Sequence, residues 1–278
     1  MARGRYLAHH VMVCIDCHSE RDWTKFTGPP KDGTWGKGGE AFSKEMGFPG
    51  MFYARNITPA GIGDWTDGEV LRAITMGVNK EGHPLFPVMP HHLYGQLAQE
   101  DMEAVVAYLR TLPAIENEVP ASRADFPMNF LLNTIPKKAA FQPVPSAADQ
   151  VRYGKYLTTA AACIKCHTQK KQGQNVAGME FAGGIEFPLP GGGKIASANI
   201  TPDPQTGIGR WSKETFVSRF KQYADSSYRP HTVGKGELNT LMPWSMYAGM
   251  EREDLEAIYV YLQSLPAVQH KVTRFTKN

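Results

Sequence analysis

The sequence is short of cysteine, of net charge and of long apolar runs. It has 4 cysteines among 278 residues and a formal net charge of +3, with basic and acidic residues interleaved. Interleaved charge offers no basic face to nucleic acid, so we expect no nucleic-acid partner. No stretch approaches the roughly 18 apolar residues of a membrane span. We therefore expect no transmembrane segment, while peripheral association with a membrane stays open.

The first residues also lack the apolar core of an export signal. Met1-Ala2-Arg3-Gly4-Arg5 runs directly into a predicted helix, so we expect no signal peptide in the chain as given. The hydrophobic fraction is 42% and the mean hydropathy −0.36, which is the composition of a globular protein. This length has room for one large or two ordinary domains.

All four cysteines fall in two copies of one motif, Cys14-Ile15-Asp16-Cys17-His18 and Cys163-Ile164-Lys165-Cys166-His167. Two thiols one helical turn apart can each add across a haem vinyl group, and the next residue's imidazole then lies under the iron. The motif predicts two covalently bound haem c groups, with His18 and His167 as proximal iron ligands. A protein built in this way is expected to carry electrons. Haem of this kind is normally attached after export, which predicts a periplasmic location.

Cysteine pairs also occur in structural zinc sites, redox-active dithiols and disulfides. A four-cysteine zinc site would need two pairs far apart in the chain to converge. It would also leave the histidine that closes each pair without a role. We therefore favour haem attachment over these alternatives.

The chain contains an internal duplication with a period near half its length. Its matching segments are Gly4-Arg5-Tyr6-Leu7 with Gly154-Lys155-Tyr156-Leu157, Gly38-Gly39 with Gly183-Gly184, Asn56-Ile57-Thr58-Pro59 with Asn199-Ile200-Thr201-Pro202, residues 61–65 with 207–211, and Met89-Pro90 with Met242-Pro243. The first copy has one residue more between its Tyr-Leu pair and its haem motif. This repeat predicts a first cytochrome c haem domain at 1–117, a proline-rich linker at 118–147 and a second haem domain at 148–278.

Each copy has the periodicity of three helices around one cofactor. One helix contains the haem motif, a second starts after a tryptophan with Thr66 or Ser212 as N-cap, and a third ends at Pro113 or Pro266. The third helix has apolar residues at i, i+3, i+4 and i+7, which indicates one buried stripe. We predict an all-α fold of two tandem class I-like cytochrome c domains, with glycine- and proline-rich loops at 28–50 and 178–193.

The second axial ligands are predicted from position in the repeat. Met89 and Met242 each precede a proline and follow their motif histidines at nearly equal distances. A thioether favours ferrous iron and raises the reduction potential, and a six-coordinate iron has no vacant site for substrate. The rival histidines do not recur in both copies, and we expect surface or hydrogen-bonding roles for them. They are His9, His10, His83, His91, His92 and His231.

Two tryptophans and two asparagines also recur. Trp65 and Trp211 are either core residues that open a helix or donors of an indole N–H to a haem propionate, and both interpretations stay open. Asn56 and Asn199 are expected to fix a turn by side-chain to backbone bonds rather than to act in catalysis.

These motifs resemble those of the cytochrome c subunits of bacterial alcohol, gluconate and sorbitol dehydrogenases and of related diheme cytochromes c. The similarity runs from Gly4 to Pro266 and includes the two haem motifs, Asn-Ile-Thr-Pro, Gly-Ile-Gly-x-Trp, Met-Pro and Tyr-Leu-x-x-Leu-Pro. The resemblance implies a dehydrogenase as electron donor and a quinone, cytochrome or oxidase of a respiratory chain as acceptor. The best-known members have three haems and a membrane attachment, whereas this chain has two haem motifs and we expect no anchor in it.

Two functions remain. The first is a non-catalytic electron carrier or dehydrogenase subunit, with both irons held by histidine and methionine. The second is a diheme enzyme, peroxidase-like or thiosulfate-oxidising, with one iron open or differently ligated. A thiosulfate enzyme would use a cysteine ligand, and no spare cysteine exists. A peroxidase would be expected to lose one methionine, but both are retained, so we favour the carrier.

Overall fold

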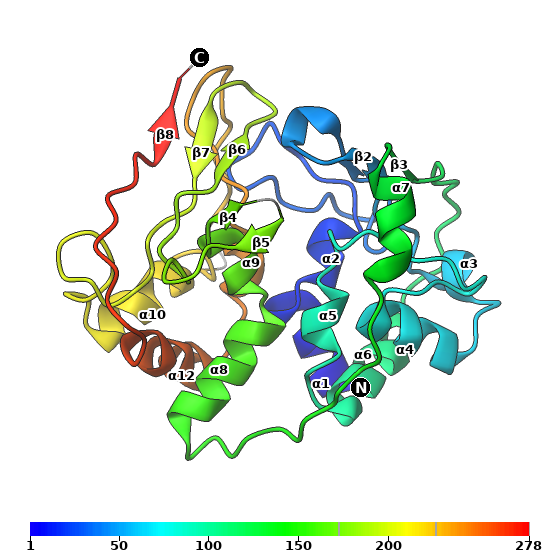
Figure 1. Cartoon of the computed structure of the whole chain (residues 1–278), viewed down its shortest axis with the longest axis horizontal. Coiled ribbons are helices and arrows are strands. Elements are labelled where there is room, and N and C mark those ends of the chain that lie inside the picture. The colour runs from blue at the N-terminus through cyan, green and yellow to red at the C-terminus, as the bar shows by residue number, and fades with distance from the viewer. Residues whose placement is uncertain (172, 226, 278) are drawn as a thin grey trace. The chain divides into compact units, whose positions relative to one another are not determined.

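The computed structural model describes residues 1–171, 173–225 and 227–277. The chain divides into two compact units (Figure 1). Unit 1 comprises Met1–Asp22 and Pro30–Pro143, and unit 2 comprises Trp23–Pro29 and Val144–Asn278. Most of the predicted linker at 118–147 is therefore part of unit 1, and seven residues from the first half of the chain are part of unit 2. The boundaries at 117 and 148 stay a prediction.

Unit 1 is built from short helices, with a small sheet formed by its long loops. The elements are α1 (Ala2–Tyr6), η1 (Leu7–Val11), α2 (Cys14–Cys17), β1 (Ala41–Phe42), η2 (Lys44–Met46), β2 (Gly50–Tyr53), α3 (Pro59–Ile62), α4 (Asp67–Met76), α5 (His91–Tyr94), α6 (Gln99–Leu109), β3 (Arg123–Ala124), α7 (Met128–Leu131) and η3 (Leu132–Thr134). The strands form an antiparallel sheet in the order β1-β2-β3.

Unit 2 repeats the helical plan with different strands. Its elements are α8 (Gln150–Ala160), α9 (Cys163–His167), β4 (Lys170–Lys171), β5 (Gln174–Asn175), β6 (Glu186–Pro188), β7 (Lys194–Ala196), α10 (Lys213–Lys221), α11 (Trp244–Tyr247), α12 (Arg252–Gln263) and β8 (Phe275–Thr276). Strand β4 pairs with β5 in antiparallel orientation, and β6, β7 and β8 form an antiparallel sheet. Among the described residues, no helix is long and apolar enough to cross a bilayer.

The prediction of an all-α fold is wrong. The protein is 34% helical and 9% strand, with three small sheets, so it is a mixed structure with extensive loops. Strands β1 and β6 lie in segments expected to be loops, and β3 lies in the predicted linker. Strands of two to four residues are too short to show an alternating pattern, and β3 and β8 pair with strands far away in the chain.

The helix boundaries follow the local signals in the sequence. Thr66 caps α4 in a capping box, in which its side chain accepts from Glu69 N at 3.2 Å and Glu69 Oε2 accepts from Thr66 N at 2.8 Å. Ser212 caps α10 by accepting from Thr215 N at 3.1 Å. Each cap satisfies backbone N–H groups that a first helical turn leaves without partners, and is worth about 1 kcal/mol.

The third helix of each copy buries the predicted stripe. In α6 the four stripe residues, Met102, Val105, Val106 and Leu109, are at most 3% exposed. In α12 three of the four are buried, while Tyr259 is partly exposed. Burying each such side chain contributes roughly 1.5–3 kcal/mol. These two helices therefore anchor the apolar core of each unit.

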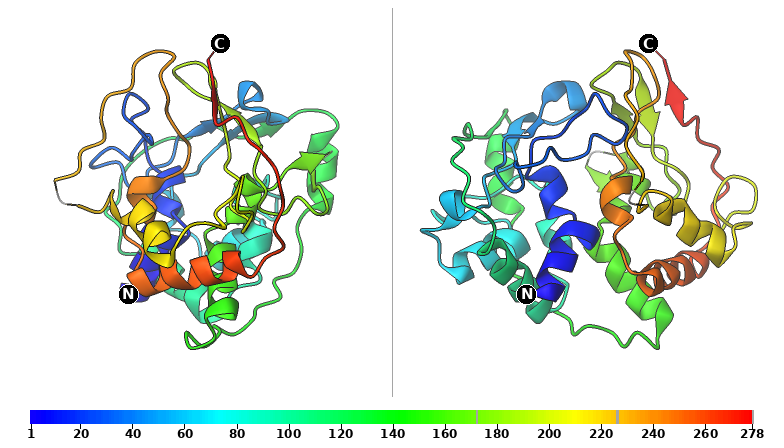
Figure 2. Two further views of the ribbon diagram at one scale, coloured as in Figure 1. Left: turned by 90° about the vertical axis from the view of Figure 1, so that its left-hand side faces the viewer. Right: turned by 180° about the vertical axis from the view of Figure 1, so that it is seen from behind.

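Each stripe helix packs against the helix that leads to the haem motif, and a glycine makes the contact close. Helix α1 packs on α6 and α8 on α12 (Figure 1), and Figure 2 shows the orange-red α12 against the green α8 from two further directions. A Cβ on Gly4 would overlap the carbonyl oxygen of Ala104, and one on Gly154 would overlap that of Ala257. The recurring Gly-x-Tyr-Leu segment therefore marks a helix crossing.

The first copy has one extra residue between Leu7 and Cys14, and a π-helix accommodates it. Residues Leu7–Val11 form η1, whereas the equivalent part of α8 is α-helical. A π-helical turn accommodates one extra residue without shifting the helix on either side. The insertion brings His9 to a position where it is 5% exposed and its Nε2 lies 2.5 Å from the hydroxyl of Tyr108.

The glycine at the crossing gives a test of the packing. Gly154→Ala should lower the free energy of unfolding of unit 2 by about 1–3 kcal/mol, because the new methyl group overlaps a helix backbone. Gly68→Ala is the matched control, since a Cβ at that helical position meets nothing within 4 Å. The control should stabilise the protein by up to about 1 kcal/mol. Equal thermal unfolding of the two variants would contradict this account of the crossing.

The buried His9 predicts a pH dependence of stability. Burial, with smaller effects of His10 and Arg5, lowers the pKa of His9 from 6.5 to about 4. Between these values the unfolded chain binds a proton that the folded chain does not, so stability rises with pH and is lost as pH falls from about 6.5 to 4. Chemical denaturation of wild type and His9→Asn across this range measures the effect. The variant should show a shallower decline, and an identical decline would exclude His9 as its source.

Candidate haem-attachment sites

Both haem motifs form a short helix entered through a left-handed residue. Val13 before α2 has φ 48°, and Ala162 before α9 has φ 52°. This conformation is uncommon for residues other than glycine and costs free energy, most of all for a β-branched valine. A tyrosine hydroxyl donates to the preceding carbonyl in each copy, Tyr94 to Met12 O at 3.4 Å and Tyr247 to Ala161 O at 2.9 Å. The same strained entry is therefore supported from outside in both copies.

The motif histidines have one orientation in common. His18 Nδ1 lies 2.7 Å from the carbonyl oxygen of Arg55, and His167 Nδ1 lies 2.7 Å from that of Ala198. A carbonyl can only accept, so Nδ1 carries the proton and Nε2 presents its lone pair. Burial lowers the pKa of both imidazoles, that of His167 to about 4. Each ring is therefore held neutral, in the tautomer that can bind iron through Nε2.

The recurring asparagine fixes the residue that supplies this carbonyl. Asn56 Oδ1 accepts from Thr58 N at 3.0 Å and Thr58 Oγ1 at 2.7 Å, and its Nδ2 donates to Ile115 O at 2.8 Å. Asn199 makes the same bonds, at the same two distances to Thr201 and at 2.8 Å to Val268 O. Both asparagines thus have the turn-forming role expected from the sequence.

Arg55 and Ala198, the residues whose carbonyls face the histidines, were not found by sequence reasoning. They act through the backbone, which carries no residue-type signal. Their position could have been found from the asparagine that follows each of them. Arg55 is further held by its own side chain, whose Nη1 donates to Val119 O and Pro120 O, each at 3.0 Å.

A glycine in each copy lets the backbone approach the histidine. Gly38 N donates to His18 O at 2.8 Å, and Gly183 N donates to His167 O at 2.8 Å. Both glycines have positive φ, 74° and 71°. A Cβ on Gly38 would overlap the backbone of Arg55, and one on Gly183 would overlap that of Ala198. These are the residues whose carbonyl oxygens face the histidine rings. Glycine is therefore required here by conformation and by space.

The cysteines lie as free thiols rather than as disulfides. Desolvation raises the pKa of Cys14, Cys17 and Cys163 to about 12 and raises that of Cys166 as well. Within the described ranges, no three side chains of His, Cys, Asp or Glu are grouped to hold a metal ion. The assignment of the four thiols to thioether attachment rests on the Cys-x-x-Cys-His spacing and stays a prediction.

Met89 and Met242 lie at equivalent positions in the backbone of the two copies. Each precedes a proline that caps a short helix, Pro90 before α5 and Pro243 before α11. Each methionine carbonyl accepts from the N–H two residues on, at 2.8 Å. Both side chains are partly exposed. Their assignment as axial ligands stays a prediction.

Trp65 and Trp211 also lie at equivalent, partly exposed positions, just before the N-caps of α4 and α10. The carbonyl oxygen of Trp65 accepts from Nη2 of Arg110, the C-cap of α6, and that of Trp211 accepts from Oη of Tyr259 in α12 at 2.8 Å. These bonds give both tryptophans a structural part in opening a helix. The indole bond to a propionate stays a prediction.

The rival histidines have varied surroundings. His91 is 1% exposed and lies so close to Gly77 that a Cβ there would meet its ring. His231 is exposed, and its ring stacks on Phe26 with centroids 4.9 Å apart.

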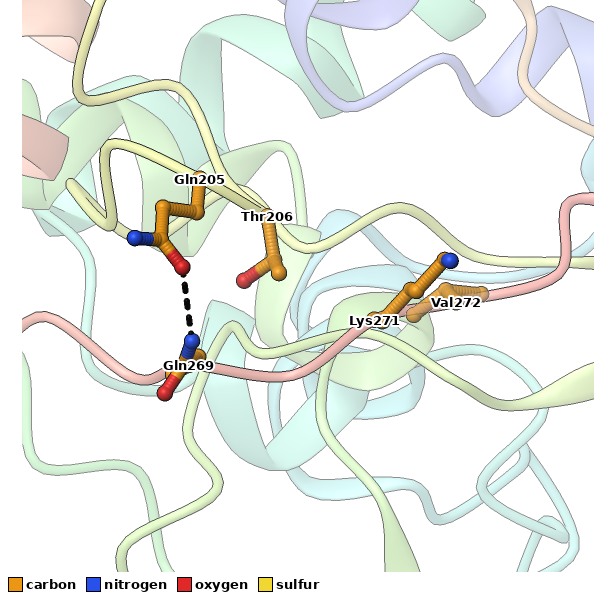
Figure 3. A pocket seen from close by; sticks show the side chains of 5 residues that line it. All are labelled: Gln205, Thr206, Gln269, Lys271 and Val272. Carbon is orange, nitrogen blue, oxygen red and sulfur yellow. Dashed lines mark hydrogen bonds between the residues drawn. The ribbon is translucent and has the colours of Figure 1, made fainter.

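A polar hollow elsewhere in unit 2 is lined by Gln205, Thr206, Gln269, Lys271 and Val272, with Gln269 Nε2 donating to Gln205 Oε1 at 2.8 Å (Figure 3). This hollow includes none of the predicted ligands.

Comparison with known proteins shows which proteins the chain resembles. Residues 151–266 match the cytochrome c family. The chain is 27% identical over 99% of its length to the cytochrome c subunit of alcohol dehydrogenase (quinone) from Gluconacetobacter polyoxogenes, covering 58% of that protein. It is 29% identical over 99% of its length to the gluconate 2-dehydrogenase cytochrome c subunit of Pantoea cypripedii, covering 62%.

A third relative, the fructose dehydrogenase cytochrome subunit of Gluconobacter japonicus, is 29% identical over 96% of this chain and is covered for 53% of its own length. The chain thus spans little more than half the length of these relatives. Over nearly its whole extent, it resembles the cytochrome c subunits of alcohol, gluconate and fructose dehydrogenases, and residues 151–266 are the part that matches the cytochrome c family.

Proposed function

We propose that this chain is a two-haem electron-transfer cytochrome c of the bacterial periplasm. One haem c is attached to Cys14 and Cys17, and the other to Cys163 and Cys166. The iron ligands are His18 with Met89 and His167 with Met242. The protein receives electrons from a dehydrogenase and delivers them to a cytochrome, an oxidase or a quinone.

One observation carries the proposal. The same hydrogen bond, from a motif histidine Nδ1 to a backbone carbonyl at 2.7 Å, is built twice from equivalent residues. A bond that fixes a histidine tautomer is typical of histidines that bind metal through the other nitrogen. Its presence in both copies supports two haems rather than one, although the family match covers only the second copy.

The chain's residues have separable tasks in this function. The cysteines would attach the porphyrin, the histidines would hold the iron through Nε2, and the methionine sulfurs would be its second protein ligands. When bound, a haem c with histidine and methionine ligands supplies a one-electron couple at a raised reduction potential. A closed sixth position excludes substrate and oxygen, so an outer-sphere transfer remains.

The partner proposed here follows from the relatives, which are named as cytochrome subunits of dehydrogenases. Encounters between redox proteins commonly bury less than about 1,200 Å², because they must dissociate after each transfer. We therefore expect a dehydrogenase to bind this chain through a small surface when the two are separate proteins.

Haem attachment can be tested copy by copy. Replacing Cys163 and Cys166 by serine should remove one haem from the protein, and replacing Cys14 and Cys17 should remove the other. Intact mass and haem staining of a denaturing gel measure covalent attachment. Each double variant should retain the haem of the unchanged copy, which serves as its control. Wild-type protein that runs without covalent haem would end the proposal.

The sulfur ligand gives a second test. Met242→Ala should lower the reduction potential of the second haem by on the order of 0.1 V, within the roughly 0.8 V that axial ligands span. Met246→Ala, in the short helix α11 that follows Met242, is the control and should leave both potentials unchanged. A redox titration measures both. If the titration of Met242→Ala is unchanged, this methionine is not an iron ligand. In a separate assay, peroxide turnover by the wild type would favour the peroxidase-like alternative.

A further inference from the structure

The loops that carry the two methionines are held in different ways. In unit 1 the loop from Met76 to Met89 is short and folds back on its own helix, with Leu85 N donating to Gly77 O at 2.7 Å. In unit 2 the loop from Lys221 to Met242 is longer. A longer loop has more conformations to lose when it is ordered, so it needs contacts from elsewhere.

Those contacts come from the segment Trp23–Pro29, which we call the strap. The strap belongs to unit 2 although it lies only five residues after His18 in the sequence. Phe26 N donates to His231 O at 2.9 Å, and Val233 N donates to Thr24 O at 2.8 Å. These bonds enclose an antiparallel bridge between Lys25 and Thr232. The strap therefore fixes the middle of the long loop.

Asn239 joins the strap to the end of the loop. Its side chain is buried, with 5% of the residue exposed. Oδ1 accepts from Thr27 N at 2.9 Å and from Thr240 N at 2.8 Å. Nδ2 donates to Lys25 O at 3.2 Å and to Trp23 O at 3.4 Å. An asparagine amide has two donor hydrogens and two acceptor lone pairs, so this side chain uses its full capacity.

The connection continues from Asn239 to the methionine. Thr240 is buried, and its Oγ1 accepts from Met242 N at 3.1 Å. The order of contacts is strap, Asn239, Thr240 and Met242, and each link is a hydrogen bond. The backbone that carries the second predicted sulfur ligand is thus held by a continuous polar chain.

The first copy has no amide side chain at the equivalent position. Phe86 stands three residues before Met89, where Asn239 stands before Met242. The Phe86 ring stacks on Phe52, with centroids 4.2 Å apart and an angle of 18° between the planes. An apolar contact takes the place of the polar one, so an effect of Asn239 should be confined to the second copy.

We infer that Asn239 is a positioning residue for the second iron site, and that it keeps the Met242 sulfur in place by tying its loop to the strap. This inference rests on the proposed function, in which Met242 binds iron. A thioether is a neutral ligand on a flexible side chain, so its hold on iron depends on the order of the backbone behind it.

The test compares variants of the holoprotein by redox titration and by the visible absorption band that a methionine–ferric iron bond produces. Asn239→Leu keeps the size of the side chain and removes all four hydrogen bonds. Asn239→Asp keeps both acceptor bonds, and Thr240→Val removes only the bond to Met242 N. Asn79→Leu is the matched control, because Asn79 Oδ1 orders the loop before Met89 by accepting from His83 N at 2.7 Å.

We expect Asn239→Leu to lower the potential of the second haem toward that of Met242→Ala, and to lose the part of the band that Met242→Ala also loses. Thr240→Val should shift both in the same direction by less. Asn239→Asp should also shift both in that direction, because its second carboxylate oxygen would face the carbonyls of Lys25 and Trp23, to which the amide donates. Asn79→Leu should leave the second haem unchanged. If Asn239→Leu fails to fold, Thr240→Val and Asn239→Asp decide the question by the same measurements.

The outcomes separate this inference from the proposed function. If the wild type shows no methionine band at the second haem, the proposed ligation fails and the role of Asn239 fails with it. If the wild type shows the band, but Asn239→Leu and Thr240→Val keep the wild-type potential and band, the ligation stands and the positioning role is overturned. A potential shift of the first haem in Asn239→Leu would also overturn it, because the effect would then be general.

Discussion

The hydrogen bond from a motif histidine to a backbone carbonyl is the constraint on which both sites depend. An imidazole can bind a metal through either nitrogen, and the bond at Nδ1 leaves only Nε2. The acceptor comes from 37 residues further along the chain for His18 and 31 for His167. The chain must therefore return to the histidine by a long loop. The asparagine turn fixes the carbonyl that accepts from the histidine. The positive-φ glycine lets the backbone after the histidine lie against the backbone that supplies this carbonyl.

Comparison of the two copies shows which contacts the duplication keeps. Both keep the histidine bond, the asparagine turn, the left-handed entry to the motif helix and the glycine at the helix crossing. They differ in the π-helix of the first copy and in how the methionine loop is held. The shared contacts position the motif helix and the predicted proximal histidine. The differences lie in the helix before the motif and in the loop before the methionine. Unequal surroundings of the two irons would give them unequal reduction potentials.

The sequence allowed good predictions where structure depends on neighbours in the chain. The stripe of α6 and the caps at Thr66 and Ser212 are local patterns, and the structure confirms them. The strands and the strap could not be predicted, because a two-residue strand has no period and its partner is chosen by the tertiary fold. The acceptor carbonyls of Arg55 and Ala198 were missed for a related reason. A backbone oxygen has no residue-type signal, and only the asparagine beside it recurs.

Buried polar side chains hold the loop segments together, as apolar packing holds the helices together. Asn56, Asn199 and Asn239 are each at most 7% exposed, and each bonds to backbone groups of two separate segments. Leaving a buried polar group without its partner costs about 1–3 kcal/mol, so a shifted loop is penalised at every such bond. Apolar contacts tolerate sliding, whereas a fully bonded amide accepts one arrangement. A site held mainly by loops needs that selectivity, because its helices fix only the two ends of each long segment.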